Sequence, residues 1–321
     1  MSPTRRSLVA ALPALTLAWP AAAAPSKDLT VRGRTIYSES SMVMSMTPDG
    51  RSAVTLRFCR FPEAGMTWLW CHVVRDGQLY AFTSHDLPCG PERLAGQPDA
   101  AYRAPPMVAS LVRTGGGESL ASVRIEAALP FHRSRAAPHG PGRAAGRFSG
   151  VFTPTRRLAA TVNAGRDEVY GLLRAEIEVG GRRLVHEGAA KFHEQRQEGP
   201  RFEGPFCYSW LAGGDAAAAT LLTAAGAGGG WQFGAAEDAL ADMAIDSPAA
   251  ARRADYRFKS GRRVAGDLAA LVRYQIPVYD RVWQGSFVRG RVDGQAVVGV
   301  VNDWTTAPDI YAAARARAGA L

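Results

Sequence analysis

Lysine is scarce in this chain, which has only Lys27, Lys191 and Lys259 among its 321 residues. Arginine therefore supplies nearly all of the formal net charge of +9, and the positive charges are scattered along the chain instead of gathered in blocks. Dispersed charge is typical of a solvated surface and argues against a nucleic-acid groove. We therefore expect no nucleic-acid partner.

The common cofactor and nucleophile motifs are also missing. The sequence contains no Gly-x-Ser-x-Gly elbow and no Gly-x-x-x-x-Gly-Lys-Ser/Thr phosphate loop. Gly226–Gly230 superficially resembles a dinucleotide loop, but Trp231 stands where the third glycine is required. We expect a flexible connection there, and a protein that works without a cofactor.

Cysteine is limited to four positions, which are Cys59, Cys71, Cys89 and Cys207. In an exported protein this even number permits one or two disulfides, with buried thiols as the alternative. Segment 71–89 holds two cysteines and two histidines, but their spacing is looser than the paired ligands of zinc sites. We expect no metal.

No apolar run of the sequence is long enough to span a membrane. The apolar run 8–19 follows Arg5 and Arg6 and precedes the small-residue tract 21–24, which is the three-part form of an export signal. Residues 1–24 are therefore predicted to be removed on export, and the mature protein is expected to be periplasmic or secreted. The adjacent arginines fit the twin-arginine route, with an ordinary secretory signal as the alternative.

The body of the chain has the pattern of an all-β protein. Its 34 glycines and 20 prolines favour turns, and short alternating apolar runs are separated by the dipeptides Asp76-Gly77, Gly180-Gly181 and Asp293-Gly294. Asp-Gly or Gly-Gly between alternating runs predicts a β-hairpin. Many short strands joined in this way indicate a barrel or a sandwich.

Helix signals are few. Alanine-rich 215–225 has helical propensity, although the glycines after it would end a helix, and Ile310–Ala318 at the C-terminus is the best helix candidate. The polar segment 197–204 is predicted to join two domains, because hairpin-rich halves lie on both sides of it. The predicted domains are residues 25–203 and 204–321.

Ionisable residues are concentrated in segment 185–196, on one predicted strand and its exit. Because alternate strand residues share a face, one face carries Lys191, His193 and Gln195 and the other carries Phe192, Glu194 and Arg196. If one face lines a barrel interior, its pKa values are shifted and a histidine or carboxylate can transfer a proton. The alternative is an exposed edge strand whose charges face water.

Five short segments occur in an order that fits one known family. They are Trp68–Trp70 before the Asp76-Gly77 turn, Lys191–Arg196, Phe206–Trp210, Trp283–Gly285 and Gly299–Asn302. The second is similar to a Trp-Phe-Asp-His-Gln-Trp motif, and the last two are similar to Trp-Glu-Gly and Gly-x-x-Glu elements. On these motifs the chain resembles the tandem-lipocalin superfamily of carotenoid 1,2-hydratases (hydroxyneurosporene synthases) and AttH-like proteins.

The departures from the family pattern fall on ionisable positions. Only Phe192 and Gln195 match the middle motif directly, and its acid and imidazole occur with their strand faces exchanged. Gln284 and Asn302 replace carboxylates, with Asp303 next to the second. The fold is transferred more safely than the activity, because it depends on pattern and not on single side chains.

The resemblance implies two lipocalin-like β-barrel domains packed together, a short C-terminal helix, and an apolar cavity in a barrel or at the junction. It also implies a cofactor-independent enzyme that hydrates, cyclises or isomerises a hydrophobic isoprenoid- or polyene-like molecule by acid catalysis. The candidate acids are His193, Glu194 and Asp303, and Arg196 would hold a polar end of the substrate.

Aromatic side chains are the expected walls of the cavity, with ordinary core packing as the alternative. They are Trp68, Trp70, Tyr208, Trp210, Trp231, Trp283 and Trp304, and the first four together with Trp283 are the preferred binding residues. A second function also fits the resemblance, namely a periplasmic lipocalin-like carrier that binds a hydrophobic ligand without catalysis.

Overall fold

The computed structural model describes residues 30–31, 34–35, 37–114, 120–134, 143–157, 165–198, 206–213, 217–224, 227–232, 238–246, 249–278 and 281–305. The expected export signal and C-terminal helix lie outside these residues, so both stay predictions. Within the described part of the chain, no helix is long and apolar enough to cross a membrane.

Strands make up most of the described chain, with a 3-10 turn at Pro62–Ala64. The first half contains β1 (Thr30–Val31), β2 (Arg34–Thr35), β3 (Ser38–Met46), β4 (Ser52–Phe61), β5 (Met66–Arg75), β6 (Gln78–Pro88), β7 (Ala101–Arg103), β8 (Val108–Thr114), β9 (Ser122–Ser134), β10 (Arg143–Arg157), β11 (Arg166–Val179) and β12 (Arg182–Gln197). The second half contains β13 (Phe206–Gly213), β14 (Ala217–Ala224), β15 (Ala227–Gln232), β16 (Asp238–Ile245), β17 (Ala251–Phe258), β18 (Arg263–Val278), β19 (Arg281–Val292) and β20 (Gln295–Thr305).

The first half forms a barrel. Its sheet has the order β10-β11-β12-β3-β4-β5-β6-β9-β8-β7, and β9 also pairs with β10, so the strands from β10 to β9 close into a ring. The short strands β8 and β7 continue the sheet from β9, and Tyr102 and Leu111 on them pack in the same core as the ring. We call this ring the first barrel.

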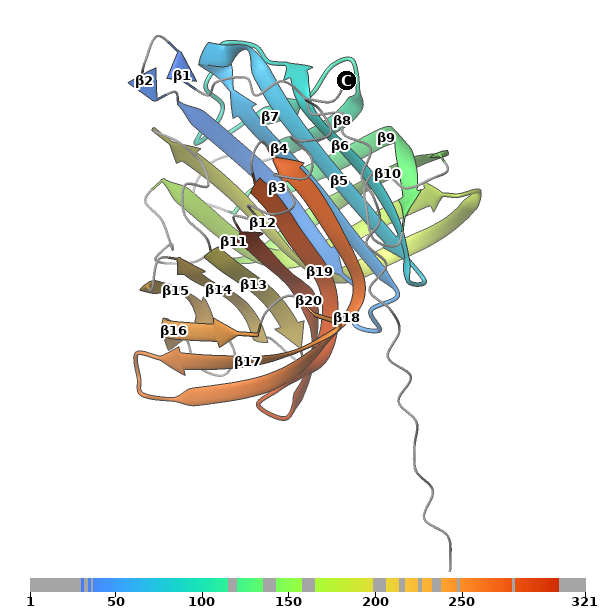
Figure 1. The fold of residues 1–321 in the computed structure, drawn as a ribbon. Helices are drawn as coiled ribbons and strands as arrows, with labels where there is room; N and C mark the ends of the chain where they lie inside the picture. Colours follow the sequence, from blue (N-terminus) through green and yellow to red (C-terminus); the bar gives the residue numbers. More distant parts are fainter. Residues whose placement is uncertain are drawn as a thin grey trace, which may run out of the picture.

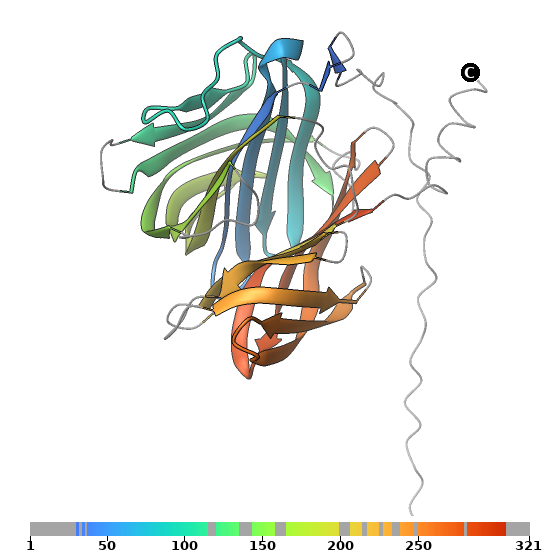
Figure 2. The same ribbon diagram turned by 90° about the vertical axis from the view of Figure 1, so that its left-hand side faces the viewer.

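The second half is a closed barrel in which β13 to β20 pair in chain order and β20 returns to β13. The two barrels pack against each other, with β18, β19 and β20 beside β3, β4 and β5 (Figures 1 and 2). The predicted all-β fold of two lipocalin-like barrels is thus confirmed. The predicted junction falls between β12 and β13, at residues that lie mostly outside the described part.

All three predicted hairpins are present, because the turn residues adopt the backbone conformation that each turn needs. Asp76 and Gly77 join β5 to β6 with φ of 48° and 74°, the positive values of a type I′ turn. Gly180-Gly181 joins β11 to β12 and Asp293-Gly294 joins β19 to β20 in the same way.

Two local expectations are wrong. The alanine-rich segment 215–225 is not helical, since its residues Ala217–Ala224 form β14. The glycine-rich segment expected to be a flexible connection lies mostly in β15. β14 pairs with β13 and with β15 over its length, and these ladder hydrogen bonds outweigh the weak intrinsic preference of alanine for helix.

Strands β3, β4 and β5 are buried on both faces. On β5, Leu69, Cys71 and Val73 point into the first barrel, whereas Trp68 and Trp70 point toward the second barrel. This double burial explains why these strands are rich in apolar residues on both faces. The described residues therefore form three hydrophobic cores, one inside each barrel and one between them. We call the surface between the barrels the inter-barrel face.

Candidate functional site between the two barrels

Strand β12 contributes to two of the three cores. Phe192 packs in the core of the first barrel, and Glu194 contacts Tyr102 there. Lys191 and His193 lie on the opposite side, where Lys191 Nζ is 4.4 Å from the centre of the Tyr208 ring of the second barrel. The alternation expected from the sequence is confirmed, and the Lys191 side is the inter-barrel face.

A buried carboxylate on β11 is the shared partner of the positively charged side chains on this face. Glu168 Oε1 accepts hydrogen bonds from Lys191 Nζ at 2.9 Å and from Arg166 Nε and Nη2 at 2.8 and 2.6 Å. His193 is attached to the same group, since its Nδ1 lies 3.3 Å from Arg166 Nη2 and its Nε2 lies 3.4 Å from Ser40 Oγ. We call Arg166, Glu168, Lys191 and His193 the Glu168 cluster.

Burial and mutual charge shift the pKa values of the two central groups. Burial lowers the pKa of Lys191 to about 7, assisted by the charges of Arg166 and Arg57, while Glu168 opposes the shift. Burial alone would raise the pKa of Glu168, but the charges of Lys191 and Arg166 bring it down to about 2. The cluster therefore holds a permanent carboxylate beside an amine that titrates near neutral pH, where a general acid or base is most effective.

Aromatic side chains cover the next part of the inter-barrel face. The guanidinium of Arg57 lies 4.7 Å from the Trp70 ring centre and 5.2 Å from that of Trp283. Trp70 stacks on Trp68 and donates its indole N–H to His85 Nε2 at 2.9 Å. Such rings attract cations through their electron-rich faces, so this part of the face suits positive charge.

Several buried polar atoms between the barrels have no hydrogen-bond partner among the described residues. They are both ring nitrogens of His72, the Tyr208 hydroxyl, the Trp210 indole nitrogen and the Thr55 hydroxyl. His72 stacks on Tyr274 at 4.2 Å between ring centres. Buried polar groups are normally bonded to protein or water. This part of the face can therefore accept hydrogen bonds from, and donate them to, water or a ligand.

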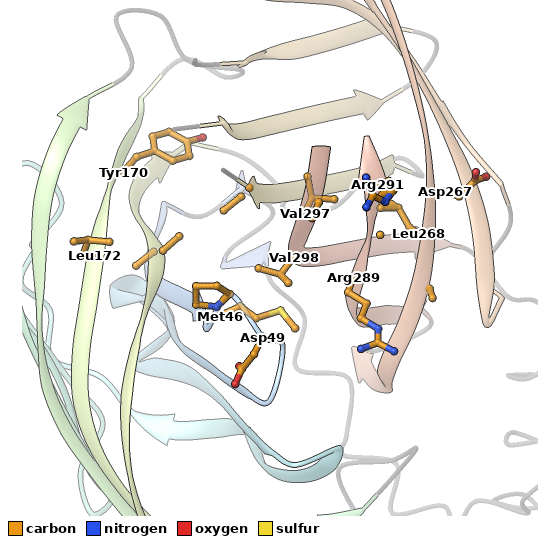
Figure 3. A pocket seen from close by; sticks show the side chains of 18 of the residues that line it. Met46, Asp49, Tyr170, Leu172, Asp267, Leu268, Arg289, Arg291, Val297 and Val298 are labelled. Atoms are coloured by element: carbon orange, nitrogen blue, oxygen red, sulfur yellow. The ribbon is translucent and has the colours of Figure 1, made fainter. Parts of the chain in front are cut away.

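An open groove of about 1270 Å³ runs between the barrels beside the Glu168 cluster. Met46, Leu172, Leu268 and other apolar side chains line it, and charged side chains such as Arg289 stand at its rim. Figure 3 shows Tyr170 projecting from β11 toward the strands of the second barrel. Volume and lining are those of a site for a small, largely apolar molecule.

Tyr170 belongs to both the groove and the cluster. It lines the groove, its hydroxyl donates to Glu168 Oε2 at 3.4 Å, and it is the direct cross-strand neighbour of Lys191. Ala189 and Ala190, which precede Lys191 on β12, line the same groove. The groove therefore ends against the buried charges.

The three acids predicted from the sequence lie in three separate places. His193 is on the inter-barrel face, as described above. Glu194 is inside the first barrel, where it accepts hydrogen bonds from Gly96 N at 2.7 Å and Tyr102 Oη at 2.8 Å and pairs with Arg113. Asp303 accepts two hydrogen bonds from Arg252, at 2.7 and 2.8 Å. The structure does not bring these three side chains together.

The predicted binding residues divide in the same manner. Arg196 is exposed, away from the inter-barrel face. The five preferred aromatic candidates lie in the core between the barrels, and these are Trp68, Trp70, Tyr208, Trp210 and Trp283. Their role as walls of a ligand site stays a prediction, but they share one surface. The other two, Trp231 and Trp304, lie on β15 and β20.

The sequence interpretation missed Glu168, Tyr170, Arg57 and His72 as site residues. Arg57 and His72 had a detectable signal, because each interrupts an apolar strand that is buried on both faces. Glu168 had none, because its position opposite His193 depends on how β11 and β12 pair. The four cysteines, all among the described residues, are thiols, with Cys59 and Cys71 buried, so the disulfide alternative is not realised.

Comparison with known proteins finds no matching family model and no similar curated sequence. Solved structures do match. An AttH-like protein of Nitrosomonas europaea has a TM-score of 0.57 at 11% identity, over 84% of this chain and 93% of that one. The chain has the fold of this group.

Two further matches come from proteins with more specific names. CghA, solved with Sch210972, has a TM-score of 0.55 at 13% identity, over 84% of this chain and 88% of that one. Kievitone hydratase from Nectria haematococca has a TM-score of 0.52 at 10% identity, over 86% of this chain and 91% of that one. These likenesses confirm the tandem-barrel fold that the resemblance implied.

Proposed function

We propose that this protein is a cofactor-independent enzyme that binds an elongated apolar small molecule in the groove and transfers a proton at its inner end. The observation that carries the proposal is the double position of Tyr170, which lines the groove and contacts Glu168. A phenol hydrogen-bonded to a buried carboxylate and next to Lys191 is placed to give or take a proton at a ligand atom.

The acid-catalysed forms of hydration, cyclisation and isomerisation of an unsaturated molecule share one need, which is proton transfer to or from carbon. Protonation of a double bond creates positive charge, and an aromatic face in the groove, such as the ring of Tyr170, can stabilise such charge. The names kievitone hydratase and CghA with Sch210972 support a small molecule as substrate. An isoprenoid or polyene is the substrate class that we propose.

The proposal includes export to the periplasm or the medium, because residues 1–24 have the form of a signal. Replacement of both Arg5 and Arg6 by lysine is expected to retain the protein in the cytoplasm if the twin-arginine route is used. Fractionation of cells that express the full chain, followed by detection of the protein, measures this directly.

Native mass spectrometry and organic extraction of the exported protein test the catalytic proposal. We expect a co-purifying apolar molecule which, on incubation with fresh protein, gains the mass of one water or changes retention time at constant mass. Tyr170→Phe keeps the ring in the groove and removes the hydroxyl, so it should retain binding and lose turnover. Full turnover by Tyr170→Phe would remove Tyr170 from the chemistry.

The second candidate function is a carrier, and the burial of the cluster favours it. Glu168 and Lys191 are both fully buried, so no part of either side chain is open to the groove. If the extracted molecule stays unaltered with wild-type protein under all conditions, and Tyr170→Phe binds it equally well, the protein is a carrier. If no molecule co-purifies and none binds, neither function holds.

A further inference from the structure

The Glu168 cluster contains more positive than negative charge. Lys191 and Arg166 both donate to the same oxygen of Glu168, at distances of 2.6 to 2.9 Å. Among the described residues, the ion pairs of both cations are with that one carboxylate. Two cations therefore share one anion in a place where Lys191 and Glu168 have no exposure to solvent and Arg166 has 11%.

A net charge that is buried in this way is unfavourable unless a group of opposite charge lies close to it. An ion taken out of water loses its hydration, and only close partners of opposite charge restore the loss. The charge can disappear in two ways, by deprotonation of Lys191 or by the arrival of a second anion. Burial lowers the pKa of Lys191 to about 7, which is in the direction of the first way, while the hydrogen bond to Glu168 favours the charged amine.

The surroundings of Lys191 can receive an anion. The Tyr208 hydroxyl is buried without a hydrogen-bond partner, and the ring that carries it faces Lys191 Nζ at 4.4 Å. A hydroxyl and an ammonium together are a donor pair suited to the oxygens of a carboxylate or an enolate. Tyr170, the cross-strand neighbour of Lys191, lines the groove, so the groove reaches the strand position next to Lys191.

We propose that the ligand of the groove carries a terminal anionic group, a carboxylate or an enolate, which passes the Tyr170 ring and binds between Lys191 and Tyr208. This inference rests on the proposed function, since it names the polar end of the molecule whose apolar part fills the groove. The apolar walls would then hold the chain of the ligand, and the shared charge of the Glu168 cluster would fix its direction.

A matched pair of fluorescent polyenes tests the inference, namely cis-parinaric acid and its methyl ester. The two have the same chain and differ in charge at one end. We expect wild-type protein to bind the acid roughly tenfold more tightly than the ester, the range of one hydrogen-bonded charge. Lys191→Met should remove this difference by weakening the acid alone, and it leaves Glu168 paired with Arg166.

Two further variants make the result specific. Arg124→Met deletes one positive charge at an exposed position of β9 outside the groove, and both affinities should stay within about twofold of wild type. Tyr208→Phe removes only the hydroxyl, and it should weaken binding of the acid but not binding of the ester. If Lys191→Met disturbs the fold, the binding data for Tyr208→Phe test the anion site instead.

The outcomes separate the two proposals. If wild type binds acid and ester equally, and neither Lys191→Met nor Tyr208→Phe changes this, the proposed anionic end of the ligand is wrong. The groove then remains a site for neutral molecules. Binding of neither probe overturns the groove as a ligand site, and the anionic end falls with it. Preference for the acid that is lost equally in Arg124→Met shows a general charge effect and overturns the inference.

Discussion

The barrel interiors and the inter-barrel face both bury charged and polar side chains, but they treat them differently. Inside the first barrel, Glu39 pairs with Arg60 and also accepts the backbone N–H groups of Leu94 and Ala95. Arg252 and Asp303 make a bidentate ion pair in the second half of the chain. Between the barrels, in contrast, two cations share Glu168, and the ring nitrogens of His72 have no hydrogen-bond partner among the described residues.

Two buried histidines show this contrast in one residue type. His186 uses both ring nitrogens, which lie 2.8 Å from Ser45 Oγ and 2.8 Å from Ser52 Oγ. His72 is equally buried and uses neither. Satisfied groups fix a structure, whereas unsatisfied ones keep the capacity to bind something else. The imidazole of His186 in the barrel interior therefore serves the fold, whereas the ring nitrogens of His72 between the barrels are available to a ligand.

The largest effect should follow from removal of the shared carboxylate. Glu168→Ala leaves Lys191 and Arg166 buried without an anion, and we expect a loss of about 3–5 kcal/mol in the free energy of unfolding, measured with urea. The neighbouring Asp167→Ala is the control, because Asp167 is half-exposed and lies 3.6 Å from Arg157 on the surface. The control should lose about 1 kcal/mol or less.

A double variant shows whether the loss comes from unpaired charge. Glu168→Ala with Lys191→Met removes one cation together with the anion and should recover part of the stability. Equal losses for Glu168→Ala and Asp167→Ala would mean that the cluster is open to water and that the contrast between the two regions is false.

The next effect compares the two histidines directly. His186→Phe leaves Ser45 and Ser52 without their imidazole partner and should lower the free energy of unfolding by about 3 kcal/mol. His72→Phe keeps an aromatic ring against Tyr274 and removes two unbonded nitrogens, so it should be neutral or stabilising by about 1 kcal/mol. Thermal unfolding of both variants measures this. A large loss from His72→Phe would show that water already satisfies this imidazole.

The fold follows from short signals, and the site does not. The hairpins at Asp76-Gly77 and Asp293-Gly294 were predictable because each turn is specified by two adjacent residues. The strand β14 was not, because its alanines prefer helix in isolation and become a strand only through pairing with β13 and β15.

Site residues depend on contacts between distant strands. Alternation along β12 correctly separated Lys191 and His193 from Glu194, but it does not say which side meets the second barrel. Glu168 stands opposite His193 only because β11 and β12 pair in one register, and Tyr208 reaches Lys191 only because the barrels pack. Sequence spacing within one strand carries no information about either contact.

Titration of each of the two buried histidines should change the free energy of unfolding by somewhat less than the substitution His186→Phe does. Burial lowers the pKa of His186 to about 4 and that of His72 to about 3, against about 6.5 in the unfolded chain. The unfolded state therefore takes up protons first as pH falls below about 6.5, and folding stability is lost from there down to the folded pKa values.

Each histidine should contribute about 2 kcal/mol of this loss between pH 7 and pH 5. Urea unfolding at the two pH values measures it, and the loss should shrink in both His72→Phe and His186→Phe. Glu168 acts in a lower window, because its folded pKa of about 2 lies below the usual value of 4.5. Its contribution is present above pH 4.5 and is lost toward pH 2. A loss between pH 7 and pH 5 unchanged in both variants would assign this titration to other groups.

The smallest effect concerns a cation at the groove rim, and it sharpens the comparison because the charge is the same and only the surroundings differ. Arg289 lines the groove but is exposed, so water and salt screen its charge, whereas Lys191 is fully buried. Arg289→Gln should change the free energy of unfolding by less than about 0.5 kcal/mol and weaken binding of parinaric acid by less than about twofold.

That weakening should vanish at about 1 M salt, where the Debye length is only about 3 Å and exposed charges are screened. The Lys191→Met effect should persist there, because salt does not reach a group without exposed surface. Similar salt sensitivity of the two variants would place the bound anion at the rim, and the buried charges would then have only a structural role.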